Sequence, residues 1–202
     1  MIDKALETLA NEISSYLERL PDLNITSQET VHLVGIVEAD GTLAIPGDSL
    51  GLCLVNIEEE RVTKAQKTAV KAPSGLITHI NPELKLNLYI LVAANFSLYK
   101  TGLEFLSGAI RFFQSKNVFT PENTPSLDPT IQKLIVEMHT LNFEQQNHLW
   151  GSLGAKYIPS VMYKARMITI QEAQATDEQP PIKEFNLLEK QPAAATAASL
   201  KA

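Results

Sequence analysis

The chain has 202 residues, of which 45% are hydrophobic and 20% are charged, and its formal net charge at pH 7 is −6. This length and composition suit one globular domain with a normal core and a short tail. The negative charge argues against nucleic-acid binding, and no apolar run reaches the roughly 18 residues that a transmembrane helix needs. The opening segment, MIDKALETLANEI, lacks the continuous apolar core of a signal peptide, so we expect synthesis in the cytoplasm.

The first sixty residues predict one helix and two strands. Apolar residues recur every three or four positions from Ile2 to Leu20, and Pro21 follows, which predicts an amphipathic helix. The β-branched run at 30–37 and the run LCLVNIEEE at 52–60 predict two strands that pair with each other. Between these runs, Asp40-Gly41 is typical of a turn.

Residues 61–82 have a different character, with four basic residues, no acidic residue, two prolines and one glycine. We predict a long, mobile loop here. The spacing of the cations would form one stripe on a helix, but their neighbours are poor helix formers. We therefore interpret the segment as a loop that orders on an acidic partner, with a solvated linker as the alternative. The candidate partner-binding residues are Arg61, Lys64, Lys67 and Lys71.

The run ELKLNLYILVAAN at 83–95 is apolar on both faces, which predicts a strand in the middle of a sheet that is covered on both sides. A helix is expected over 95–116, with Asn95 or Ser97 as its cap. Gly102 and Gly108 weaken its helix propensity, and we expect them to allow close packing on the sheet. The predicted buried stripe of this helix consists of Tyr99, Leu103, Leu106, Ile110 and Phe113.

Shorter elements complete the domain. We predict a short strand at 117–120, a proline-rich loop, and a strand at 131–141 with Leu134, Val136 and Met138 facing inward. Asn142 and Gln145 have the spacing of a capping box for a short helix that ends at Gly154. The last strand spans 160–170, and its inward face consists of Val161, Tyr163, Ala165 and Met167.

The order of these elements predicts an α+β fold with a mixed, mainly antiparallel sheet of about four to six strands covered by helices. The segment after Gln171 is polar, alanine-rich and interrupted by proline, which is typical of a flexible tail. We therefore divide the chain into a folded domain at 1–172 and a tail at 173–202.

The sequence offers little chemistry. Adjacent residues in a strand point to opposite faces, so Glu58, Glu59 and Glu60 cannot form one acid–base site and are interpreted as a solvated strand end. The four histidines lack metal-site spacing, and the single cysteine, Cys53, is interpreted as a core residue, as is the single tryptophan, Trp150. We predict no catalytic residue, no metal and no cofactor.

Several stretches together resemble one family: MIDKALETLANEISSYLE, LVNIEEER, NPELKLNLYILVAANFSLY, FFQSKNVFTPENTP and LWGSLGAKYIPSVMYKARMITI. They are similar to the amino-terminal domain of the cap, or tail-terminator, protein of extracellular contractile injection systems of the antifeeding-prophage and virulence-cassette type. The resemblance covers about residues 1–172, and none of these stretches is a catalytic motif.

The resemblance implies an assembly role and a fold like that of phage tail-terminator proteins. Such proteins form a six-fold ring at the distal end of the inner tube of the particle, stop tube growth and hold the last sheath layer. The implied partners are further copies of the chain and the tube and sheath proteins, with no nucleic acid and no membrane. The alternatives are a small enzyme that uses Cys53 or the glutamate run, and an adaptor or regulatory domain outside any particle.

Overall fold

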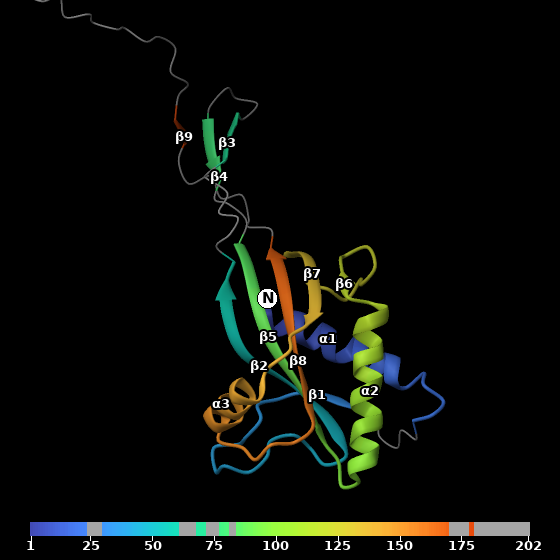
Figure 1. Cartoon of the computed structure of the whole chain (residues 1–202). Coiled ribbons are helices and arrows are strands. Elements are labelled where there is room, and N and C mark those ends of the chain that lie inside the picture. The colour runs from blue at the N-terminus through green and yellow to red at the C-terminus, as the bar shows by residue number, and fades with distance from the viewer. Residues whose placement is uncertain (24–29, 61–67, 72–76, 81–83, 170–177, 180–202) are drawn as a thin grey trace, which may run out of the picture.

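The computed structural model describes residues 1–23, 30–60, 68–71, 77–80, 84–169 and 178–179. Its centre is a mixed six-stranded sheet in the order β1-β2-β5-β8-β7-β6 (Figure 1). These strands are β1 (Val31–Leu33), β2 (Ser49–Glu59), β5 (Leu84–Asn95), β8 (Ser160–Thr169), β7 (Ile131–Met138) and β6 (Val118–Phe119). β1 runs parallel to β2, and the other neighbours are antiparallel. The predicted α+β class is confirmed.

β5 lies in the middle of the sheet, as its sequence predicts. Leu88, Ile90 and Val92 point into the larger core, whereas Leu91 and Ala93 point into a smaller core on the opposite face. Alternation also places Tyr163, Ala165 and Met167 of β8 in the larger core, with Val161 packed against it.

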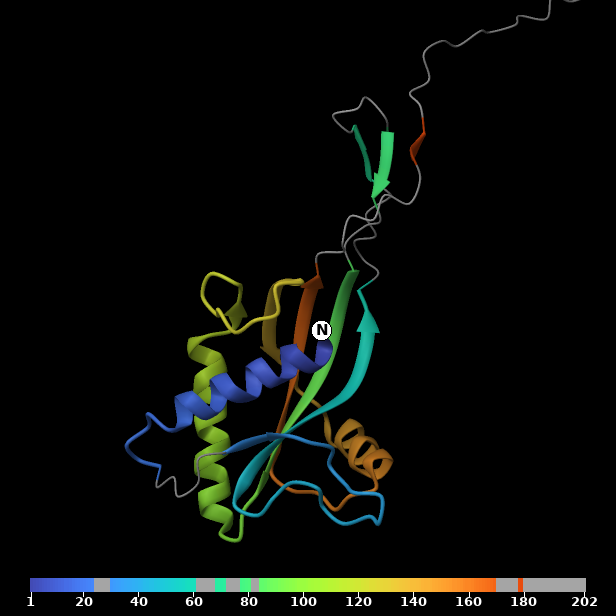
Figure 2. The same ribbon diagram turned by 180° about the vertical axis from the view of Figure 1, so that it is seen from behind.

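Two helices cover the face of the sheet that carries the larger core, α1 (Ile2–Leu17) and α2 (Tyr99–Ser115) (Figure 2). Where they meet, a Cβ atom on Gly108 would collide with Leu17 Cδ2. Gly108 therefore allows α2 to approach α1, and not the sheet as predicted. At Gly102 the expectation holds, because its nearest neighbours are Phe96 and Ala94 at the end of β5.

The predicted stripe of α2 is only partly confirmed, because Leu106 and Phe113 are buried but its other members are not. Tyr99 and Leu103 are exposed, and Ile110 is only partly buried. Small residues share the packed side of the helix, and the prediction gave weight only to large ones. The buried residues of α2 are Gly102, Phe105, Leu106, Gly108, Ala109, Phe112 and Phe113.

The predicted caps of α2 are also wrong. The N-cap is Leu98, which makes no side-chain capping bond. The Asn95 side chain instead donates to the Ile45 carbonyl at 2.7 Å, and the Ser97 backbone N–H donates to Asp48 Oδ1 at 2.9 Å. Both hydrogen bonds thus tie the turn before α2 to the loop before β2. Met138 was also expected to face inward, but it is 53% exposed because it ends β7 beside the short β6.

The opposite face of the sheet is covered by α3 (Phe143–Leu153) and by the segment 34–48. The predicted capping box is present: Gln145 N donates to Asn142 Oδ1 at 2.8 Å, and Asn142 N donates to Gln145 Oε1 at 3.0 Å. Gly154 ends the helix with φ 68°, as predicted. Among the described side chains of α3, only Trp150 is fully buried.

A second sheet contains β3 (Thr68–Lys71), β4 (Ile77–Ile80) and β9 (Glu178–Gln179), in that order. β3 and β4 contradict the prediction that 61–82 is a loop throughout, because residues 68–71 pair antiparallel with 77–80. Glu59 pairs with Leu86, and Leu84 pairs with Thr169. The last residue of β2, the first residue of β5 and the last residue of β8 therefore lie at the same end of the main sheet. The second sheet lies beyond that end in Figure 1. The tail predicted at 173–202 falls outside the described residues except for β9.

Candidate docking surface

The structure places several of the titratable side chains considered in the sequence. Cys53 is buried, and this burial raises the pKa of its thiol. Glu58 accepts a hydrogen bond from the Tyr89 hydroxyl at 2.9 Å, and the His139 ring packs edge-on against Tyr89 at 5.2 Å. Within the described part of the chain, no group of three or more His, Cys, Asp or Glu side chains could hold a metal ion. No helix in the same part is long and apolar enough to cross a membrane.

The basic residues proposed for partner binding remain a prediction. Arg61, Lys64 and Lys67 lie outside the described residues, and Lys71 is the last residue of β3. No contact among these four basic residues can therefore be described.

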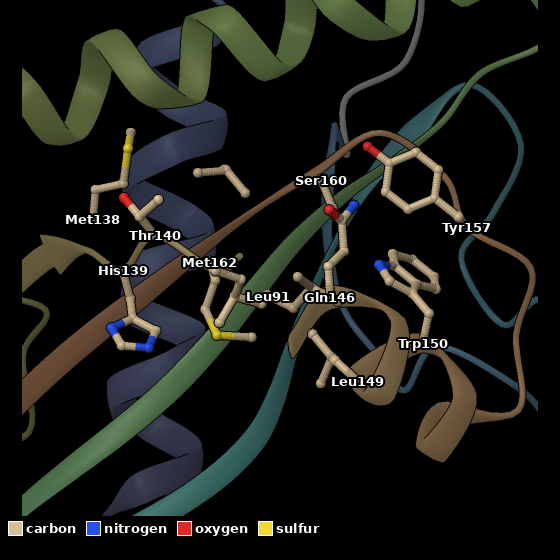
Figure 3. Close-up of a pocket in the computed structure, with 12 residues that line it drawn as sticks. Leu91, Met138, His139, Thr140, Gln146, Leu149, Trp150, Tyr157, Ser160 and Met162 are labelled. Carbon is tan, nitrogen blue, oxygen red and sulfur yellow. The ribbon is translucent and has the colours of Figure 1, made fainter. Parts of the chain in front are cut away.

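A pocket of about 240 Å³ lies between α3, β8 and the connection from β7 to α3. Figure 3 shows Trp150, Gln146 and Tyr157 close together at one end of this pocket, and Met138 and His139 at the other. Leu91, Leu149 and Met162 are among its other apolar lining residues. We call it the Trp150 pocket.

Trp150 was interpreted as a core residue, and it is 4% exposed. Its buried indole Nε1 nevertheless has no hydrogen-bond partner among the described residues. An unpaired buried donor costs about 1–3 kcal/mol. This unpaired donor lies beside the pocket but has almost no accessible surface of its own, and the sequence does not reveal it.

Exposed apolar side chains surround the same pocket. Tyr157 is 58% exposed, and its ring meets Trp150 edge-on at a centroid distance of 5.6 Å. Met138, which also lines the pocket, is 53% exposed. Solvent-exposed apolar residues gathered at a pocket are typical of a protein-binding surface.

Comparison with known proteins identifies the family. The sequence matches the Pvc16 N-terminal domain family over residues 4–184. The chain belongs to this family. The family resemblance drawn from the sequence is therefore confirmed. The sequence comparison with curated proteins finds no significant relative.

Two solved structures share the fold of this Pvc16 N-terminal domain. One is the sheath/tube terminator of the PVC extracellular contractile injection system in its extended state, with a TM-score of 0.56 and 10% identity over 97% of this chain. The other is the tube-terminating cap of the anti-feeding prophage, with a TM-score of 0.57 and 12% identity over 93% of this chain. The predicted tail-terminator-like fold is thus confirmed. The chain spans 65% and 60% of the lengths of those two proteins.

This Pvc16 N-terminal domain has a second exposed apolar patch, on the other face of the sheet. It consists of Leu98 and Tyr99 at the start of α2, together with Leu103 one turn later. α2 packs on the larger core, whereas Trp150 of α3 belongs to the smaller one. The two apolar patches therefore lie on opposite faces of the sheet.

Proposed function

We propose that this domain is the structural cap, or tail terminator, of a phage-tail-like contractile injection particle. In this proposal it ends growth of the inner tube, anchors the last sheath layer and acts as a six-fold ring at the distal end of the particle. Residues 1–172 carry this role. The single observation that supports it most is the fold shared with two terminator proteins over at least 93% of this chain.

A closed ring is the natural form for such a cap. A six-fold tube end presents six equivalent sites, and a cyclic arrangement lets each copy repeat one interface. A growing tube needs a free end to which the next ring of subunits can bind. A cap that occupies all six sites removes that end.

We also propose that the domain acts without catalysis. Both structural neighbours are terminator proteins, and Cys53, the strongest candidate nucleophile, is buried with a raised thiol pKa. A protonated, buried thiol is a poor nucleophile.

Cryo-microscopy of complete particles tests the proposal. We expect six copies of this domain in the terminal density, and longer tubes of uneven length in particles made without the chain. A different protein in that density, with tube length unaffected by loss of this chain, would disprove the capping role. That result would favour the alternative, an adaptor or regulatory domain that never enters the particle.

A further inference from the structure

The second sheet joins two parts of the chain that carry opposite charge. Residues 61–82, which contain β3 and β4, have four Lys or Arg residues and no acidic residue. Residues 171–179, which end with β9, have three acidic residues and no Lys or Arg. β9 pairs antiparallel with β4, so that Glu178 lies opposite Thr78 and Gln179 lies opposite Ile77. The structure therefore places the end of an acidic segment on a strand of the basic segment.

The pairing of β9 with β4 is short. It comprises two residue pairs, whereas β3 and β4 share four. Pro180 and Pro181 follow β9 directly, and proline has no backbone N–H to donate to a neighbouring strand. In the order β3-β4-β9, β9 is also an edge strand with β4 as its one neighbour. β9 is therefore displaced more easily than β3, and its departure exposes the edge of β4.

The edge of β4 that β9 covers suits an acidic strand from another protein. Without β9, this edge offers backbone N–H and C=O groups that pair with an extended segment of a partner. The four cations of residues 61–82 favour a segment that carries negative charge. β9 shows that such a segment fits, because it is extended and contains Glu178. The second sheet lies beyond the end of the main sheet, away from α1, α2 and α3 (Figures 1 and 2).

We propose that β9 occupies, before docking, the edge of β4 with which an acidic strand of the docking partner pairs in the particle. β9 is then a competitor that the chain itself carries. Docking displaces it, and any change that holds β9 in place weakens docking. This inference rests on the proposed cap and on its attachment through the basic segment, and it names the edge that binds and the strand that competes.

A reversible disulfide tests this competition. In a Cys53→Ala background, Thr78→Cys and Glu178→Cys replace two paired residues and hold β9 on β4 when oxidised. Co-sedimentation with uncapped particles at low salt compares the oxidised and reduced forms of the full chain. We expect the oxidised form to bind at least roughly fivefold more weakly, since each backbone hydrogen bond that the partner cannot make costs about that factor. Equal binding, or failure of the disulfide to form before docking, would overturn the proposal.

The matched control links β3 to β4 and leaves β9 free. In the same background, Thr68→Cys and Ile80→Cys also replace two paired residues. Its oxidised and reduced forms should bind uncapped particles equally well. Weaker binding after oxidation of this control as well would contradict the proposal, because stiffening of the hairpin, and not occupancy of the β4 edge, would then reduce docking.

Removal of charge from the β9 segment gives an effect of the opposite sign. Asp177→Asn together with Glu178→Gln weakens the attraction between this segment and the basic one, so we expect tighter binding to uncapped particles at low salt, by up to about fivefold per charge. The control, Glu7→Gln together with Glu38→Gln, changes the net charge equally at exposed positions outside the second sheet. An equal gain in the control would show that net charge alone matters, and would overturn competition by β9.

The same assays separate this inference from the capping role. If the native chain binds uncapped particles while the oxidised and reduced forms bind alike, the capping role stands and competition by β9 is wrong. If no form of the chain binds uncapped particles, the capping role fails, and the inference that rests on it fails too.

Discussion

Single residues in the large core set much of the stability, and Leu88 is the clearest case. It is fully buried in β5, at the centre of the sheet. We expect Leu88→Ala to lower the free energy of unfolding by about 2–5 kcal/mol, because it removes buried apolar atoms and leaves a cavity. Leu103→Ala, at a side chain that is 39% exposed, is the control and should cost less. A urea titration measures both, and a loss below about 1 kcal/mol for Leu88→Ala would contradict this packing.

Asp128 links stability to pH at the start of β7. It accepts bonds from the Thr130 hydroxyl at 2.6 Å and the Thr130 backbone N–H at 2.9 Å, and its Oδ2 lies 3.6 Å from Lys4 Nζ. These contacts, the Thr130 hydroxyl above all, hold the pKa of Asp128 below the ordinary value of 3.8. As the pH falls, the Asp128 carboxylate is therefore protonated at a higher pH in the unfolded chain than in the folded chain. The stabilisation is present above the unfolded pKa and is lost as the pH falls through the folded one.

We accordingly expect Asp128→Asn to lower the urea midpoint at about pH 7, and the difference from the native chain to shrink at about pH 2. Asp22→Asn, at an exposed loop position, controls for the loss of one negative charge. A difference for Asp128→Asn that stays constant across this range would show that the ionised carboxylate is not what stabilises this turn.

At the scale of elements, two glycines inside helices should respond oppositely to the same change. Gly108 of α2 faces α1, where a methyl group would collide with Leu17, a fully buried side chain. Apart from its chain neighbours and the adjacent helix backbone, Gly151 of α3 has no atom within 4 Å of the position a Cβ would take. Alanine is favoured over glycine in a helix by about 1 kcal/mol. We expect Gly151→Ala to raise the melting temperature, and Gly108→Ala to lower it because overpacking costs about 1–3 kcal/mol.

Thermal unfolding followed by circular dichroism gives the sign of both changes. The pair controls itself, since each variant adds one methyl group to a helix. Stabilisation by Gly108→Ala would mean that α1 and α2 are not in close contact at this point.

The short helix α3 depends on its cap. It has eleven residues and buries only Trp150 fully, so packing supports it weakly. Asn142→Ala removes one of the two capping-box bonds and should cost about 1 kcal/mol, whereas Asn142→Asp keeps the acceptor. Hydrogen exchange of the α3 amides measures local opening. We expect faster exchange for Asn142→Ala only, and unchanged exchange in α3 would contradict the role of the cap.

The elements also show what the sequence could predict. The inward and outward residues alternate without interruption in β5 and β8, and Asn142 and Gln145 have the spacing of a capping box. Both patterns depend only on residues close together in the sequence, and both predictions are confirmed. The predicted stripe of α2 was only partly right, because its packed side is also marked by Gly102, Gly108 and Ala109, which hydrophobicity patterns overlook. β3 and β4 were missed because their pairing stabilises segments whose local composition favours a loop.

At the scale of the whole molecule, the candidate surface was the least predictable feature. The Trp150 pocket is built from β5, β7, α3 and β8, which are far apart in the sequence, and only tertiary packing brings them together. The sequence identified Trp150 as buried, but an unpaired donor can be recognised only when every neighbour is known. Fold class and family were recognised because they depend on patterns spread along the chain.

The basic segment gives the last prediction, which concerns attachment of the whole domain to the particle. The chain is acidic overall, yet residues 61–82 carry four cations and no acidic residue. We expect this segment to contact an acidic patch of the tube or sheath. An exposed ion pair contributes only about 0–1 kcal/mol, so single substitutions should have little effect. Changing Arg61, Lys64, Lys67 and Lys71 together to Ser should weaken docking at low salt.

The control removes four other exposed cations, Arg19, Lys100, Arg111 and Lys156, which changes the net charge equally. Binding of each variant to uncapped particles is measured by co-sedimentation at low and high salt. Because salt screens exposed charges over about 10 Å at 0.1 M, the native chain and the first variant should converge as salt rises. If both quadruple variants bind as well as the native chain at low salt, the segment is a linker and docking depends on other surfaces.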